Sequence, residues 1–187
     1  MLRVDHAGET AAVRIYEGQR AVLGRTAEAP LLVEMAEHER AHLERFQRLV
    51  RLGGHAAIYA QSLMPARSQL PQYRARPSAL LPLWAGAAYA LGAGSALLGR
   101  EAAYAVTEAV EDIITAHYND QLRELSSDAH LTEEVELRAV FRAFRDEEQA
   151  HLDAAVERDA HKAPFYSALS FVVKRGCRAA IWVCKRV

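Results

Sequence analysis

The chain has 187 residues, a length that suits one domain with a buried core over residues 1–187. With 51% hydrophobic and 25% charged residues it is not a largely disordered protein, and a formal net charge of −1 excludes a molecule built as a whole to bind nucleic acid. Aromatic residues make up only 7%, and the abundance of alanine and leucine favours helices over sheets.

Two helices are predicted in the first third of the chain. One runs from about residue 5 to residue 23, where apolar side chains recur at helical spacing at Ala12, Ile15, Tyr16 and Val22. The other begins near Pro30, which suits the first turn of a helix, and runs to about residue 52, before two glycines. The first six residues leave no room for a secretory signal peptide.

The middle of the chain contains two segments of unusual composition. Residues of about 53–77 contain three prolines, two serines and three arginines, and are predicted to form an irregular insertion. Residues 78–99 carry no charge over 22 positions (99 − 78 + 1), which is long enough for a membrane span. Because Pro82 and four glycines interrupt this segment, we expect instead a buried crossover helix or one that dips into a membrane surface.

Three more helices are predicted over residues of about 100–125, 132–161 and 164–187. Thr132 suits the N-cap of the second, and Pro164 suits the first turn of the third. Four core helices, one long connection and extra apolar and C-terminal helices predict an all-α four-helix bundle with a crossover connection.

A repeated spacing carries the chemistry. Glu39 and His42 form one Glu-x-x-His motif, and Glu148 and His151 form another. Positions i and i+3 share one helix face, so both side chains of each motif can point at one metal. A single copy occurs often by chance as a solvated pair, but the second copy favours a metal site.

A lone glutamate precedes each motif on the preceding helix. Glu9 comes 30 residues (39 − 9) before the first motif, and Glu111 comes 37 residues (148 − 111) before the second. Antiparallel hairpins bring such residues level, which yields the di-iron or di-manganese signature of ferritin-like bundles. Oxygen and imidazole donors suit these metals. The predicted ligands are Glu9, Glu39, His42, Glu111, Glu148 and His151.

Several alternatives stay open at this point. Residues 38–42 also read as the His-Glu-x-x-His motif of zinc proteases, but Glu147 stands where the second copy would need a histidine, so His38 is expected to be a neighbouring polar residue. Periodicity does not choose between Glu108 and Glu111. His117 and Tyr118 are predicted either to hydrogen-bond to a metal ligand or only to pack.

Ten short segments carry a recognisable pattern: 3–9 (RVDHAGE), 14–16 (RIY), 18–19 (GQ), 21–26 (AVLGRT), 81–84 (LPLW), 90–94 (ALGAG), 109–111 (AVE), 117–119 (HYN), 144–148 (FRDEE) and 176–181 (GCRAAI). In these segments the sequence closely resembles the demethoxyubiquinone hydroxylases of ubiquinone biosynthesis. The resemblance covers nearly the whole chain and favours Glu111 over Glu108, but the chain departs from the family pattern between about residues 53 and 76.

The resemblance implies an oxidoreductase, a di-iron monooxygenase that hydroxylates the ring of a polyprenylated demethoxyubiquinol. Two ferrous ions would react with O2, and electrons would ultimately come from NADH. A homo-oligomer, or an assembly with other quinone-biosynthesis proteins, fits the family. The competing hypotheses are a ferritin-like iron-oxidising or iron-handling protein, and a non-catalytic membrane adaptor.

A bilayer substrate fits the last predicted helix. Residues 164–187 combine apolar side chains with five basic ones, which is typical of an interfacial helix as well as of a core helix with a solvated basic face. We therefore expect a peripheral protein on the cytoplasmic face of a bacterial inner membrane. Cys177 and Cys184, about 10 Å apart along this helix, are too far apart for a disulfide.

Overall fold

The computed structural model describes residues 2–51, 77–127 and 135–187. Within these ranges every regular element is a helix, which confirms the predicted all-α class. The elements are α1 (Leu2–Leu23), α2 (Ala29–Arg51), α4 (Leu81–Leu97), α5 (Arg100–Ser127), α6 (Val135–Glu157), the short 3₁₀ helix η1 (Ala160–Lys162) and α7 (Tyr166–Cys184).

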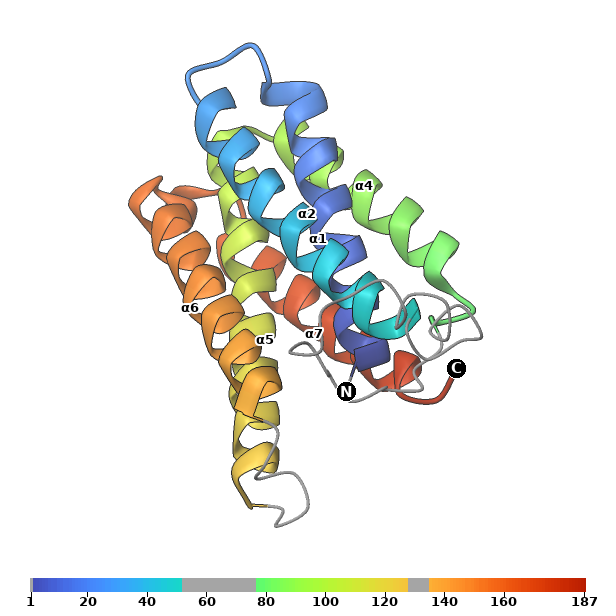
Figure 1. Cartoon of the computed structure of the whole chain (residues 1–187). Coiled ribbons are helices and arrows are strands. Elements are labelled where there is room, and N and C mark those ends of the chain that lie inside the picture. The colour runs from blue at the N-terminus through green and yellow to red at the C-terminus, as the bar shows by residue number, and fades with distance from the viewer. Residues whose placement is uncertain (1, 52–76, 128–134) are drawn as a thin grey trace.

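Two helical hairpins form the core of the bundle (Figure 1). Helix α1 packs against α2, and α5 packs against α6. Since α2 and α5 run in the same direction, the chain must return along the bundle between them, and α4 makes that return on the outer side of α1 (Figure 1). Helix α7 packs against α5 and touches α1, so it closes another side of the core.

Backbone contact joins α1 to α4. A Cβ atom built on Gly18 would overlap the carbonyl oxygen of Tyr89, and one built on Gly92 would overlap the carbonyl oxygen of Ile15. Only glycine lets two helices approach this closely. These two glycines therefore set the distance between α1 and the returning helix.

Helix α4 is less buried than the sequence suggested. Its buried residues are Ala88, Gly92, Ser95 and Ala96, whereas Leu83 is 60% exposed and Leu97 is 75% exposed. Helix α4 makes the predicted crossover, but the expectation that it is buried is wrong, because α4 uses only a narrow stripe of small residues to pack on its neighbours. Across the described ranges, no helix is both long and apolar enough to span a membrane.

The helix ends differ from the prediction by a few residues. Helix α1 already begins at Leu2, and α6 ends at Glu157 rather than near residue 161. Asp159 adopts a left-handed conformation with φ of 64°, as does Phe165 with φ of 55°, just before α7. Such residues break the helical hydrogen-bond ladder. The predicted irregular insertion at 53–77 and the Thr132 cap lie almost entirely outside the described residues.

Glu28 joins three helix ends at one side of the bundle. Its buried carboxylate, just before α2, accepts a 2.7 Å hydrogen bond from the hydroxyl of Tyr104 on α5. It also accepts one of 2.6 Å from Arg158, just after α6, and one of 3.3 Å from Arg100 at the start of α5. The core helices are thus held in register near one end.

Candidate metal centre

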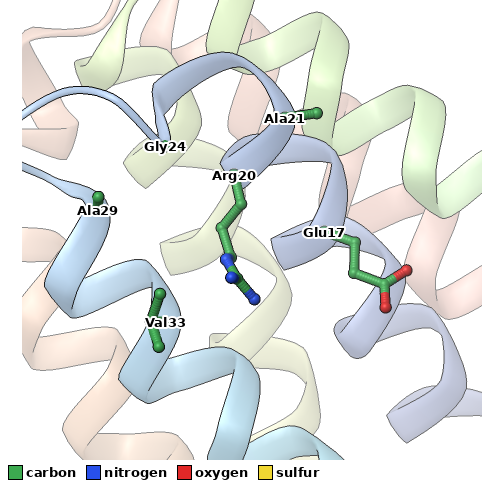
Figure 2. Close-up of a pocket in the computed structure, with 6 residues that line it drawn as sticks. All are labelled: Glu17, Arg20, Ala21, Gly24, Ala29 and Val33. Carbon is green, nitrogen blue, oxygen red and sulfur yellow. The ribbon is translucent and has the colours of Figure 1, made fainter.

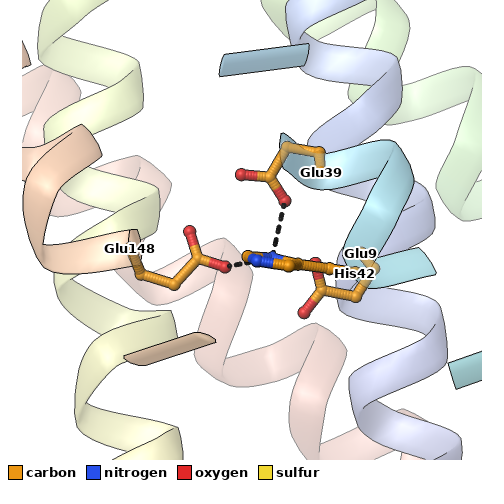
Figure 3. A group of neighbouring side chains, drawn as sticks. All are labelled: Glu9, Glu39, His42 and Glu148. Atoms are coloured by element: carbon orange, nitrogen blue, oxygen red, sulfur yellow. Dashed lines mark ion pairs between the residues drawn. The ribbon is translucent and has the colours of Figure 1, made fainter. Parts of the chain in front are cut away.

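All six predicted ligands meet inside the bundle, one or two from each core helix. They form two groups whose ligand atoms lie within 4.8 Å of one another, and Glu39 and Glu148 belong to both groups. Figure 3 shows the first group, with Glu39 above the ring of His42 and Glu148 beside it. The first group is Glu9, Glu39, His42 and Glu148; the second is Glu39, Glu111, Glu148 and His151.

Helical spacing explains why each motif points inward. Glu39 and His42 lie one turn apart on α2, as Glu148 and His151 do on α6, and all four side chains are at most 4% exposed. The motifs lie on α2 and α6, which contact each other in the bundle. The local period therefore aims each pair, and the packing of the hairpins brings the two pairs together.

Both histidines turn the same ring nitrogen toward the carboxylates. Nδ1 of His42 lies 3.2 Å from Oε1 of Glu148 and 3.5 Å from Oε2 of Glu9. Nδ1 of His151 lies 3.0 Å from Oε1 of Glu39 and 3.4 Å from Oε2 of Glu148. Each half of the site thus presents one imidazole nitrogen among carboxylate oxygens.

The donor atoms fit a pair of metal ions. Nδ1 of both histidines and both carboxylate oxygens of Glu39 and Glu148 make no hydrogen bond within the described structure. One oxygen each of Glu9 and Glu111 is likewise unsatisfied there. Buried polar atoms are normally hydrogen-bonded, so six inward-facing residues with unsatisfied atoms indicate a site shaped for cations.

The electrostatics point the same way. Burial, followed by repulsion from the other carboxylates, raises the pKa values of Glu39 and Glu111 well above the ordinary range. Burial alone would also raise the pKa of Glu148, but the adjacent imidazoles of His151 and His42 lower it to about 2. Crowded carboxylates of this kind favour a site that binds cations.

The residue before each Glu-x-x-His motif reaches the histidine of the other motif. Oε2 of Glu147 lies 2.7 Å from Nε2 of His42, and Nδ1 of His38 lies 3.1 Å from Nε2 of His151. The rings of His38 and His151 also stack, with centroids 5.4 Å apart. His38 is therefore a neighbouring residue as predicted, but its direct contact with a candidate ligand was not.

Two tyrosines form a similar reciprocal pair of contacts between α1 and α5, each with the candidate ligand on the other helix. Tyr16 lies seven residues (16 − 9) after Glu9 and donates a 2.8 Å hydrogen bond to Oε1 of Glu111. Tyr118 lies seven residues (118 − 111) after Glu111 and donates to Glu9. The sequence indicated Tyr118 as a candidate partner of a ligand but did not indicate Tyr16 by its helical pattern, although both tyrosines follow a candidate ligand by seven residues.

Comparison with known proteins agrees with this architecture. The family described as Ubiquinone biosynthesis protein COQ7 matches residues 1–184. The chain belongs to this family.

Relatives of the COQ7 family match over the whole chain. A Dictyostelium discoideum protein named NADPH-dependent 3-demethoxyubiquinone 3-hydroxylase, mitochondrial, is 46% identical over 187 residues, which are 100% of this chain and 76% of that protein. The Homo sapiens protein of the same name is 42% identical with the same coverage. A Rhodospirillum rubrum protein named 3-demethoxyubiquinol 3-hydroxylase is 43% identical, again over 100% and 76%. The resemblance found in the sequence motifs is thereby confirmed.

Two further candidates in this COQ7 family member turn away from the cluster. Oε1 of Glu108 accepts a 2.7 Å hydrogen bond from Tyr166 on α7, and Glu108 belongs to neither ligand group. His117 lies 3.2 Å from Oδ1 of Asp5, and Gln121 donates to the same oxygen at 2.6 Å. His117 therefore joins a polar network between α1 and α5 rather than contacting a candidate ligand.

An apolar cavity of about 380 Å³ reaches the cluster from the side of α7. Its wall comes from α1, α4, α5 and α7, and is made mostly of alanine, valine, isoleucine and leucine side chains. Glu9 and Tyr118 lie in this wall as well. The cavity therefore connects a largely apolar space with the α1 side of the carboxylate cluster.

A second hollow, of about 360 Å³, lies between the end of α1 and the start of α2 (Figure 2). It is lined by charged Glu17 and Arg20 together with Ala21, Gly24, Ala29 and Val33. None of these residues belongs to the ligand groups. The residues that line this hollow therefore include none of the candidate metal ligands.

Proposed function

We propose that this protein is a di-iron monooxygenase that uses O2 to hydroxylate the ring of a polyprenylated demethoxyubiquinol in ubiquinone biosynthesis. The observation that carries the proposal is the apolar cavity whose wall includes Glu9 and Tyr118. An apolar space beside a buried carboxylate–imidazole cluster suits a hydrophobic substrate that reacts at metal. The names of the relatives support the same ring chemistry.

The proposed ligands are Glu9, Glu39, His42, Glu111, Glu148 and His151. Four carboxylates carry a charge of −4, which two divalent ions balance. Oxygen and imidazole donors without a thiolate favour iron or manganese over softer metals. Because Glu39 and Glu148 belong to both groups, each of them could help to hold both ions.

The surrounding side chains have separate tasks in this proposal. Two ferrous ions would supply the electrons and the open coordination positions for O2. Glu147 and His38 hold the imidazoles so that Nδ1 faces inward. Tyr16 and Tyr118 hold one oxygen of Glu111 and Glu9. The apolar wall excludes water from the substrate ring.

The proposal includes peripheral binding to the cytoplasmic face of a bacterial inner membrane. On α7, Phe171, Val172 and Trp182 are 58–65% exposed. The guanidinium groups of Arg175 and Arg186 lie 5.3 Å and 3.8 Å from the ring centroids of Phe171 and Trp182. Exposed apolar side chains flanked by cations are typical of a helix at a membrane surface, and α7 also contributes to the cavity wall.

We propose NADH as the ultimate electron source, while several relatives are named NADPH-dependent. The sequence lacks the Gly-x-Gly-x-x-Gly fingerprint of a Rossmann-type site. A comparison of both nucleotides as reductants is therefore part of the test.

The decisive experiment measures metal content and product together. The purified chain is loaded anaerobically with Fe²⁺, and bound iron is counted. It is then mixed with a short-chain demethoxyquinol, a reductant and O2, and the product is examined by mass spectrometry. We expect two irons per chain and a gain of one oxygen atom on the ring. Iron-loaded protein that leaves the ring unchanged would overturn the proposal.

Ligand variants separate this function from iron handling. Glu148→Ala and His42→Ala are each expected to abolish hydroxylation while helix content stays mostly intact. Glu108→Ala is the matched control, because Glu108 is a carboxylate on α5 that contacts Tyr166 instead of the cluster. A ferritin-like protein would instead oxidise and retain many irons per chain without converting the quinol.

A further inference from the structure

Gly8 is an unusual residue for its place on α1. It directly precedes the candidate ligand Glu9 and lines the apolar cavity. A Cβ atom built on Gly8 would meet no heavy atom within 4 Å. Glycine is the poorest helix former apart from proline, and here no close backbone contact requires it.

Gly176 on α7 repeats these features across the cavity. It lines the same space, and a Cβ atom built there also meets nothing within 4 Å. Gly176 is exposed, whereas Gly8 is partly buried. Gly176 therefore lies at the open side of the cavity, and Gly8 lies beside the carboxylate cluster.

The other open glycines of the bundle do not share this position. Gly86 and Gly94 on α4 are exposed and equally free of neighbours within 4 Å, but neither lines the cavity. Gly18 and Gly92 differ in the opposite way, because backbone contact between α1 and α4 occupies the space of a side chain. Packing thus explains Gly18 and Gly92, and it does not explain Gly8 or Gly176.

We propose that Gly8 and Gly176 are specificity-determining residues that keep the cavity wide enough for a flat aromatic ring. The inference rests on the proposed quinol hydroxylation. A flat ring needs wall atoms no nearer than about 3.5–4 Å to each face, so a side chain projecting from α1 or α7 removes part of that space. The absence of a side chain at Gly8 leaves room for the aromatic ring beside Glu9. The absence of a side chain at Gly176 leaves room for the ring to enter the cavity.

Ring binding can be measured without metal or turnover. The chain has two tryptophans, of which Trp84 lines the cavity and Trp182 is exposed on α7. In a Trp182→Phe background, quenching of Trp84 fluorescence by a short-chain demethoxyquinone reports occupancy of the cavity. The variants are Gly8→Ala, Gly8→Leu and Gly176→Leu, and the matched controls are Gly86→Leu and Gly94→Leu.

We expect Gly8→Leu and Gly176→Leu to weaken quinone binding at least tenfold, and Gly8→Ala to weaken it less. The melting temperature of Gly8→Ala should equal or exceed that of the parent, since the added Cβ atom meets no heavy atom within 4 Å and alanine favours the helix. The two controls should bind like the parent. Iron content of the Gly8 variants, measured separately, should also match the parent, which excludes displacement of Glu9.

The outcomes distinguish this inference from the function on which it rests. If the parent binds quinone and both leucine variants in the cavity bind equally well, the assignment of the glycines is wrong while the proposed function stands. If the parent itself shows no quinone binding, both fail. If Gly8→Leu does not fold, Gly8→Ala and Gly176→Leu still decide the result. Gly8→Ala adds only a methyl group beside Glu9, and Gly176→Leu changes a residue on α7 instead.

Discussion

Nε2 of His42 lies 2.7 Å from Oε2 of Glu147 across the interface of α2 and α6. A carboxylate accepts a hydrogen bond, so Nε2 carries a proton, and Nδ1 is the ring nitrogen that faces the buried glutamates. The equivalent partner of His151 is His38, an imidazole at 3.1 Å. One histidine of the site is thus oriented by a carboxylate and the other by an imidazole ring.

Glu147→Ala should weaken metal binding by about 10–100-fold, because outer partners of metal-bound histidines fix the ring and raise its basicity. Glu147→Gln should lose less, since its amide oxygen still accepts a hydrogen bond. Titration of the metal-free protein with Co²⁺, followed by its absorption bands, measures the affinity.

The control for this prediction is the neighbouring Asp146→Ala. Asp146 is exposed on the same helix and pairs with Arg145 instead of a candidate ligand. Its loss should leave Co²⁺ affinity unchanged. Equal affinities for Glu147→Ala and Asp146→Ala would show that the His42 contact has no role in metal binding.

The metal-free protein should be more stable at pH 5.5 than at pH 7.5. Burial and mutual repulsion raise the pKa values of Glu39 and Glu111 above their unfolded values, so their destabilising ionisation grows as the pH rises. Burial would lower the pKa of His42, but Glu148 and Glu9 raise it to about 12. The proton on His42 makes its full contribution to folding stability below the unfolded-state pKa of histidine. This contribution is lost progressively as the pH rises from that value toward the folded-state pKa.

Thermal unfolding at several pH values, with and without bound metal, tests this dependence. Metal ions replace the protons, so metal should raise the melting temperature more at pH 7.5 than at pH 5.5. Glu39→Gln should flatten the pH dependence of the metal-free form. A metal-free melting temperature that climbs steadily from pH 5.5 to pH 7.5 would contradict the prediction.

Gly18→Ala should lower the free energy of unfolding by roughly 1–3 kcal/mol, the usual cost of overpacking. The added methyl group meets the backbone of α4, which is held by its own hydrogen bonds and yields less easily than a side chain. Gly86→Ala is the matched control and should gain up to about 1 kcal/mol through helix propensity. Urea unfolding measures both, and a stabilised Gly18→Ala would refute the close contact of α1 and α4.

Glu28→Ala should destabilise the fold by about 1–3 kcal/mol, because it removes the shared acceptor of three hydrogen bonds, two of them from partly exposed arginines. Glu17→Ala, which removes a more exposed carboxylate paired with Arg14 and Arg40, should cost at most about 1 kcal/mol. Equal losses in urea unfolding would show that the Glu28 cluster is an ordinary surface pair.

The same carboxylate predicts acid sensitivity. Burial would raise the pKa of Glu28, but hydrogen bonds from Tyr104 and Arg100 and the charge of Arg158 lower it overall. A lowered folded-state pKa gives stability that is present above the unfolded pKa and lost as the pH falls through the folded value. The difference in stability between the parent and Glu28→Ala should therefore shrink below about pH 4.3, and a difference that stays constant down to pH 3 would contradict it.

The sequence by itself determined the features that depend on helical period. Glu-x-x-His puts two donors on one face of any helix, so both motifs could be read before their helices were placed. The all-α class and the family resemblance followed from composition and motifs in the same way. The helix ends did not follow from the periodicity, because a left-handed residue, Asp159, comes just after the end of α6 although the apolar pattern predicted a longer helix.

Only the tertiary structure decided contacts between helices that are far apart in the sequence. Glu108 and Glu111 lie one turn apart, and the rotation of α5 sends the first toward Tyr166 and the second toward the cluster. The hydrogen bond from Tyr16 to Glu111 spans 95 residues, and its existence depends on how α1 and α5 are rotated and staggered. Covalent geometry sets neighbours within one helix, whereas the relative placement of whole helices is set by the packing of all their side chains together.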